Sequence, residues 1–376
     1  MVLLRFITPL IILSLCSVMP AQVVFDESIN QLAQGLVDTQ IVNVNADDYG
    51  GWPDEEWATG AITLGMISAF QRTGVEEYRT VVHRAGINIV SNAYVDPYVF
   101  YGDSAYALVK IEEDLSNNWL SSLESYYELI ETTGTRIYLQ DYDNYDNSMA
   151  AYYLAHHVLS VYSLDRADKQ IWRNKLIQNL GQTDDESHFP VMALALSIWA
   201  LAETGSLDNT LVDPNANDSN YWYQKQLKDL PALLMSHKVP SGLADAGCYF
   251  WKFNHMGGPE DAIVRSGYTE DVVFGTLACL SLYAQASDVN LVNTNDDPSD
   301  DVSVEGTWME QMNPSFTELE QSLIEAETIL IGAIHEDGSV CAHVLLGGDE
   351  YYTFAGEVLH ALCLLDCYEE TRLGLK

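Results

Sequence analysis

Acidic and aromatic side chains are concentrated in six stretches of this chain, each directly before a segment predicted to form an apolar helix. Carboxylates can fix sugar hydroxyls, and the flat faces of tyrosine and tryptophan pack on the apolar face of a pyranose ring. These stretches therefore predict a carbohydrate-binding mouth, although their aromatic residues would also suit a simple roof over the core. The ligand-binding candidates are Trp52, Trp57, Tyr145, His188, Trp251, His255 and Tyr352.

Hydrolysis of a glycosidic bond further requires two carboxyls that face each other across that bond, one protonated and one ionised. Asp103 begins the second of six repeated segments, and Glu270 and Asp271 begin the fifth, so a ring would place them opposite each other. We take Asp103 and Asp271 as the candidate catalytic acid and base. The competing interpretation is helix capping, because acids just before or inside the first turn stabilise a helix.

No cofactor is expected from the sequence, and no metal site is predicted. His156 and His157 are adjacent on one helix and therefore point to different sides. Asp141, Asp143 and Asp146 offer several oxygens for calcium, but the glycine and distal glutamate of an EF-hand loop are missing. A calcium requirement is left open.

Six similar apolar segments carry these candidates. They start near Thr59, Asp103, Asn147, Phe189, Thr269 and Tyr352, and the first four starts are 44, 44 and 42 residues apart. The last intervals, 80 and 83 residues, are about twice as long. A repeat of this length, with two helices in each unit, is typical of stacked helical hairpins.

The small and apolar segments predict six inner helices, and amphipathic segments predict outer ones. The outer helices are expected at residues 26–40, 75–92, 118–132, 166–180, 221–237 and 316–334. An amino-terminal outer helix beside a carboxy-terminal inner helix lets the array close. We therefore predict an all-α fold, an (α/α)6 toroid spanning residues 22–376 as one domain. Loop insertions near residues 206–219 and 288–314 explain the doubled intervals.

The amino terminus has the pattern of a signal peptide over residues 1–21. Arg5 precedes an apolar run from Ile7 to Val18, which is too short to span a membrane comfortably, and Ala21 is a small residue at a plausible cleavage position. The mature protein is therefore expected to be secreted, extracellular or periplasmic, with no membrane insertion after signal removal.

The net charge of −38, from 55 acidic against 17 basic residues, limits the possible partners. Nucleic acid and anionic membrane surfaces would be repelled, and polyuronates are disfavoured. The expected partner is a neutral carbohydrate or another small ligand.

Two short stretches resemble repeat motifs of known toroids. Gly50-Gly51-Trp52 and Asp337-Gly338-Ser339, the latter followed by residues 353–359, resemble the repeats of squalene and terpene cyclases and of protein prenyltransferases. Those families imply an α/α-toroid fold. The Asp-x-Asp-Asp motif of the cyclases is absent, because Asn45 replaces its first acid, and no Asp, Cys and His zinc set of a prenyltransferase is found.

The helices within residues 61–92 are also similar to hairpins of six-hairpin glycosidases and toroidal polysaccharide lyases. This resemblance implies a carbohydrate-active protein, a glycoside hydrolase or lyase. Two alternatives stay open: a toroid that binds a partner without catalysis, and a terpene-cyclase-like or prenyltransferase-like enzyme that lacks the usual acid motif.

Overall fold

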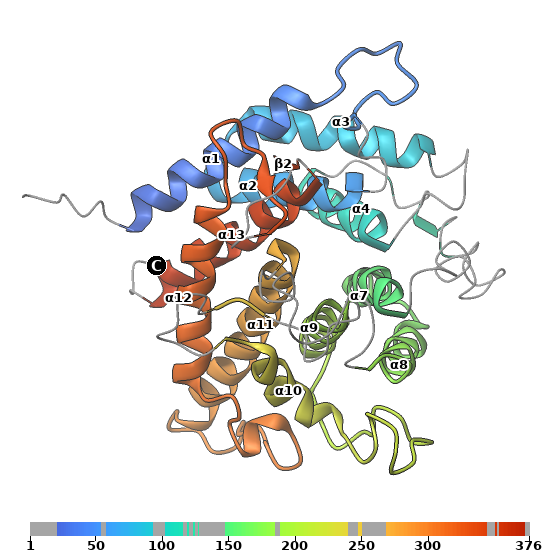
Figure 1. The fold of residues 1–376 in the computed structure, drawn as a ribbon, viewed down its shortest axis with the longest axis vertical. Helices are drawn as coiled ribbons and strands as arrows, with labels where there is room; N and C mark the ends of the chain where they lie inside the picture. Colours follow the sequence, from blue (N-terminus) through green and yellow to red (C-terminus); the bar gives the residue numbers. More distant parts are fainter. Residues whose placement is uncertain are drawn as a thin grey trace, which may run out of the picture.

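Six inner helices form a closed ring in the computed structural model (Figure 1). The structure describes residues 21–53, 58–92, 102–115, 119, 123–124, 127, 147–184, 189–239, 247–249, 268–343, 350–351 and 353–372. Each inner helix packs against the next, and the last packs against the first, so the predicted all-α (α/α)6 toroid is confirmed. The inner helices are α2 (Thr59–Thr73), α4 (Gly102–Leu115), α7 (Asn147–Ser163), α9 (Pro190–Glu203), α11 (Thr269–Asn293) and α13 (Thr353–Arg372).

Outer helices cover this ring. Those in the described part are α1 (Ala21–Thr39), α3 (Glu76–Asn92), α8 (Lys169–Leu180), α10 (Leu230–His237) and α12 (Phe316–Gly332). Helix α1 packs against α13, α2 and α3, which joins the two ends of the helical array, as Figure 1 shows. The outer helix expected at residues 118–132 lies almost wholly outside the described residues, although Leu123 and Tyr127 are described and buried.

The closing seam between α2 and α13 depends on two glycines. A Cβ atom at Gly65 would lie 2.2 Å from the carbonyl oxygen of Gly356, and one at Gly356 would lie 2.3 Å from Cα of Ile62. The two backbones are therefore in direct contact, which only residues without a side chain permit. At the far end of the seam, Arg72 pairs with Asp366 and, at 2.6 Å, with Glu370.

The fourth outer helix is shorter than expected. The sequence predicted a helix over residues 221–237, but α10 begins at Leu230, after the short 3₁₀ helix η2 (Leu227–Asp229). Pro231 stands in the first turn of α10, where its missing N–H costs nothing, and residues 221–225 form turns instead.

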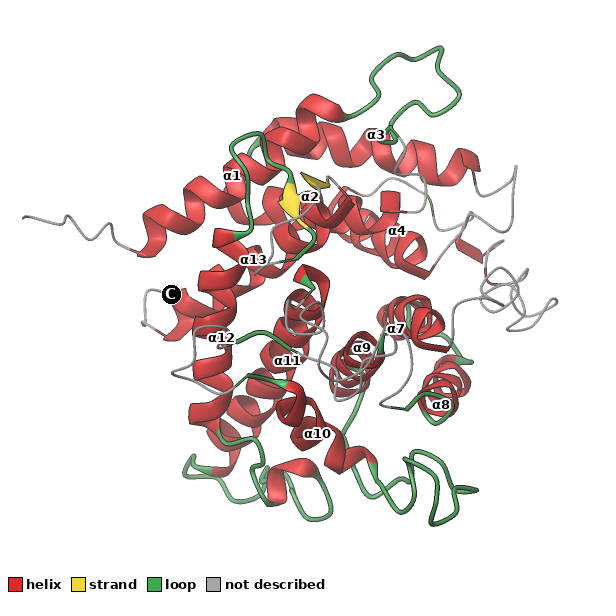
Figure 2. Cartoon of the chain, viewed as in Figure 1, coloured by secondary structure: helices red, strands yellow, loops and turns green. Residues whose placement is uncertain are grey.

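The two insertions meet at the end of the ring away from the inner-helix amino termini. The backbone N–H of Trp308, in the 3₁₀ helix η4 (Trp308–Glu310), donates to the carbonyl of Leu207 at 3.1 Å. Leu207 and Val212 of the first insertion and Trp308 of the second are buried, so both insertions contribute side chains to the core. The described strands, β1 (Val340–Cys341) and β2 (Glu350–Tyr351), pair antiparallel beside the helices (Figure 2).

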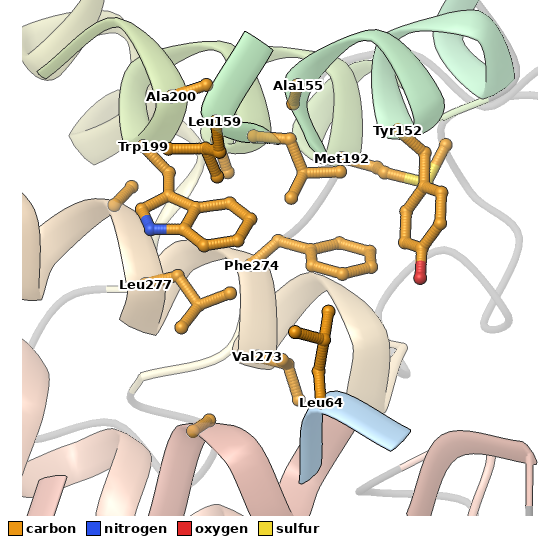
Figure 3. Close-up of a cluster of buried hydrophobic side chains, with 14 of the residues drawn as sticks. Leu64, Tyr152, Ala155, Leu159, Met192, Trp199, Ala200, Val273, Phe274 and Leu277 are labelled. Atoms are coloured by element: carbon orange, nitrogen blue, oxygen red, sulfur yellow. The ribbon is translucent and has the colours of Figure 1, made fainter. Parts of the chain in front are cut away.

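Apolar side chains fill the middle of the ring. Figure 3 shows Trp199 of α9, Phe274 of α11 and Tyr152 of α7 in one cluster of buried side chains, and the ring centroids of Tyr152 and Phe274 are 5.9 Å apart. Trp199 is 5% exposed and Phe274 is 2% exposed, so the ring is packed at this level and is not an open channel.

Within the described residues, α11 is the one helix long and apolar enough to cross a membrane by length and composition. About 61% of its most apolar window is buried inside the ring, as expected for a core helix.

Candidate functional site

Four inner helices bring polar side chains together above the apolar centre of the ring. Asp103 and Glu270 lie in the first turns of α4 and α11, Glu357 is the fifth residue of α13, and Tyr152 is the sixth of α7. The charges of Asp103 and Glu270 both act on Glu357, and the charges of Asp103 and Glu357 act on Tyr152. We call these four residues the axial cluster.

Glu357 is held by a single described hydrogen bond. The hydroxyl of Tyr152 donates to its Oε1 at 2.9 Å, while its buried Oε2 has no partner in the described part of the chain. Burial, together with the charge of Glu270 and that of Asp103, raises the pKa of Glu357 well above its usual value. This carboxyl therefore keeps a proton under conditions in which an exposed glutamate has lost it.

Asp103, predicted as a catalytic residue, is fully buried. Its Oδ2 accepts the backbone N–H of Ala61 at 3.1 Å, which ties the start of α4 to the start of α2. Its buried Oδ1 has no hydrogen-bond partner among the described residues. Burial raises the pKa of Asp103 to about 7, against the lowering effect of the backbone N–H groups. In this structure its carboxyl contacts other helices rather than solvent.

Asp271, the other predicted catalytic residue, is 4% exposed, whereas the neighbouring Glu270 is only half-buried. Burial raises the pKa of both carboxyls to about 8, and the charge of Asp271 adds to the shift of Glu270. Glu270 is the member of this pair whose charge acts on Glu357. Glu270 is therefore the acid on the neighbouring helix α11 that is electrostatically coupled to Glu357 of α13.

A small cavity lies at the bottom of the axial cluster. Tyr152, His156, Glu357 and His360 contribute its polar lining, and its volume of about 20 Å³ has room for a single water molecule. The Nδ1 of His156 lies 2.8 Å from the carbonyl of Tyr152, and the Nδ1 of His360 lies 2.7 Å from the hydroxyl of Ser68. Burial lowers the pKa of each histidine to about 4, so both are neutral near pH 7.

The other predicted site residues fall into two groups. Trp52 is 2% exposed, and its Nε1–H donates to the carbonyl of Leu36 at 2.8 Å, so it packs in the core and presents no face to a ligand. The remaining candidates lie outside the described residues, namely Trp57, Tyr145, His188, Trp251, His255 and Tyr352.

Sequence reasoning missed Glu357 and Tyr152. Glu357 carried a signal, since it is the one acid in the small and apolar segment 353–365. An acid inside a helix predicted to be buried needs a reason, because an unpaired buried charge is costly. Tyr152 carried no such signal, because tyrosine is common at the edge of a core.

In the described part of the chain, no group of three or more histidine, cysteine, aspartate or glutamate side chains has the geometry of a metal site.

The carboxyls of raised pKa make stability depend on pH. Between about pH 6.5 and pH 8, unfolded carboxyls are ionised, while folded Glu270 and Asp271 still bind protons. Because the folded state binds more protons, the free energy of unfolding falls as the pH rises, by roughly 1 kcal/mol per pH unit for each such group. Below that window the buried His156 and His360 have the opposite effect on stability. They stay neutral while unfolded histidine gains a proton, so their contribution to the free energy of unfolding falls as the pH falls.

Urea unfolding at several pH values between about 6.5 and 8 measures this slope. Asp271→Asn removes one titrating carboxyl and is expected to make the slope shallower. Asp301→Asn, in an exposed loop, is the matched control and is expected to leave the slope unchanged. A wild-type stability that rises through this window would contradict the assignment.

Comparison with known proteins adds a distant structural likeness. No protein-family model matches the chain, and no curated protein matches it in sequence. Among solved structures, the chain is similar to the GH76A alpha-1,6-mannanase from Salegentibacter sp. HEL1_6, with a TM-score of 0.47 and 11% sequence identity. The likeness covers 92% of this chain and 99% of that one.

Proposed function

We propose that this protein is a secreted toroid that binds a neutral extracellular carbohydrate at the inner-helix amino-terminal mouth and hydrolyses a glycosidic bond there. The observation that carries the proposal is the axial cluster, in which the charges of Asp103 and Glu270 act on Glu357 and the hydroxyl of Tyr152 donates to it. In it, Glu357 acts as the general acid, and Glu270 acts as the second carboxyl.

The protonation state of the cluster supports acid catalysis. A general acid must hold its proton near the working pH and release it to the leaving oxygen. Glu357 meets the first condition, because burial and neighbouring carboxylates favour its neutral form. The hydrogen bond from Tyr152 to Oε1 fixes the orientation of the carboxyl and leaves Oε2 as the oxygen that can carry the proton.

Exposure favours Glu270 over the two acids named from the sequence. Asp103 and Asp271 are buried and Glu270 is half-buried, while Glu357 is half-buried as a residue although its Oε2 is buried. A catalytic carboxyl must reach its substrate, so Asp103 and Asp271 are assigned to the support of the site. Asp103 does this by accepting the backbone N–H of Ala61, and Asp271 lies beside Glu270 in the first turn of α11.

The mouth and the net charge indicate the substrate class. The aromatic residues Trp57, Tyr145, Trp251 and Tyr352 precede inner helices in the sequence, where they supply flat faces for sugar rings, and His188 and His255 supply polar contacts. A net charge of −38 opposes the approach of polyanions, so the expected substrate is an uncharged polysaccharide or oligosaccharide.

A panel of neutral and uronate-containing glycans tests the proposal, with binding and release of reducing ends both measured on the purified protein. Binding of at least one neutral glycan with release of reducing ends is the expected result. The absence of both binding and release over the whole panel would overturn the proposal.

A toroid that binds carbohydrate without catalysis is the second candidate. The described cavity below the cluster holds about one water and admits no sugar ring, so any glycan lies above the cluster rather than within it. Binding without reducing-end release would favour this function.

A further inference from the structure

His335 and Cys341 form a close pair at the turn that leads into α13. The backbone N–H of His335 donates to the carbonyl of Ser339 at 2.9 Å, and the N–H of Gly338 donates to the carbonyl of His335 at 3.0 Å. This turn brings the two side chains to one side, where Sγ of Cys341 lies 2.9 Å from Nε2 of His335. Both residues are half-buried, so each keeps part of its surface in contact with solvent.

The pair is fixed to the ring from two sides. The Nε2–H of Gln31, on α1, donates to the carbonyl of His335. On the other side, the hydroxyl of Thr269 donates to the carbonyl of Cys341, and the N–H of Thr269 donates to the carbonyl of Ala342 at 3.0 Å. Thr269 is the first residue of α11, so the thiol lies on the mouth side of the ring, next to the helix that carries Glu270.

We propose that Cys341 is a reactive thiol, activated by His335, that exchanges with small neutral or cationic disulfides. In the reaction His335 accepts the thiol proton, and the Cys341 sulfur attacks one sulfur of the disulfide. A new sulfur–sulfur bond forms as the old one breaks, and the second sulfur leaves as a thiolate. A thiol beside an imidazole is activated because the thiolate is the nucleophile and the imidazolium stabilises it.

The surroundings define which disulfides react. The negative charge of the chain repels anionic disulfides and favours neutral or cationic ones. An exported protein also meets disulfides rather than a reducing thiol pool. Cys341 is the last residue of β1, and the carbonyls of Cys341 and Ala342 accept hydrogen bonds from Thr269 at the start of α11. A group attached to Cys341 would therefore lie beside the proposed glycan mouth.

The other cysteines of the chain provide internal references. Cys279 and Cys363 are buried, and burial raises the pKa of Cys279 to about 11 and that of Cys363 well above its usual value. Both are therefore poor nucleophiles at neutral pH. Cys367, on α13, is half-buried like Cys341 and serves as the matched thiol of similar exposure.

Exposure of the native full-length protein to bis(2-hydroxyethyl) disulfide at neutral pH, followed by peptide mass spectrometry, tests the proposal. The mixed disulfide is expected on Cys341 at a rate at least about tenfold above that on Cys367, because the imidazole of His335 lies close enough to accept the Cys341 proton. His335→Gln is expected to lower the Cys341 rate toward that of Cys367, and Cys341→Ser to abolish the fast adduct.

Equal rates on Cys341 and Cys367 in the wild-type protein would overturn the proposal, and this comparison needs no variant to fold. A folded His335→Gln protein, checked by its thermal unfolding, that keeps the wild-type Cys341 rate would also overturn it. Glutathione disulfide, which is anionic, is expected to react more slowly than cystamine, and the reverse order would contradict the electrostatic selection.

Discussion

Replacing Glu357 by glutamine is expected to lower the rate of glycan hydrolysis by about 10²-fold to 10⁴-fold, which is the usual contribution of a general acid. Glutamine keeps the size of the side chain and an oxygen that can accept the Tyr152 hydrogen bond, but it has no proton to give to the leaving oxygen. The measurement is kcat/KM for reducing-end release on the best glycan of the panel.

Glycan affinity separates loss of chemistry from loss of structure. The Glu357→Gln protein is expected to bind glycan about as tightly as the wild type, because the change removes a proton donor and leaves the mouth residues intact. Glu76→Gln, whose carboxyl is 75% exposed on α3, is the matched control and is expected to retain full activity. An active Glu357→Gln protein would remove this residue from the catalytic role.

Replacing Gly356 by alanine is expected to destabilise the protein by at least about 2 kcal/mol. The new Cβ would lie 2.3 Å from Cα and 2.7 Å from N of Ile62, and backbone atoms of a packed helix cannot turn aside as a flexible side chain can. Overpacking of this kind costs about 3 kcal/mol, and the better helix propensity of alanine offsets roughly 1 kcal/mol. Urea unfolding measures the difference.

Gly332→Ala is the matched control for that experiment. Gly332 ends α12, and a Cβ there meets no atom within 4 Å, so alanine is expected to be neutral or stabilising by up to about 1 kcal/mol. If Gly356→Ala were as stable as Gly332→Ala, the direct backbone contact between α2 and α13 would be wrong.

The inner helices could be predicted closely because buried helices have a distinctive amino-acid composition. A helix surrounded by other helices is small and apolar on every side, and the segments starting near Thr59, Asn147 and Thr269 show this. The end of α11 could not be predicted, since the helix continues to Asn293 beyond the apolar part. There Leu291 is 71% exposed, and residues 287–293 are mostly poor helix formers, so neither burial nor propensity marks the continuation.

The candidate site was only partly predictable. Asp103 and the Glu270–Asp271 pair were found because they stand at the starts of inner helices, a position that the repeat pattern fixes. The pattern did not separate a buried acid from a half-buried one, because that difference arises from neighbouring helices. Tyr152 acquires its role only through contact with Glu357, a residue from another repeat far along the chain.

The seam formed by Gly65 and Gly356 constrains how the molecule is made. Helix α13 is synthesised after every other described helix, yet it must lie against α2 before the ring is complete. A nascent chain that lacks α13 would expose the apolar side of α2 to solvent throughout translation. In such a chain the ring stays open until residue 372 has left the ribosome.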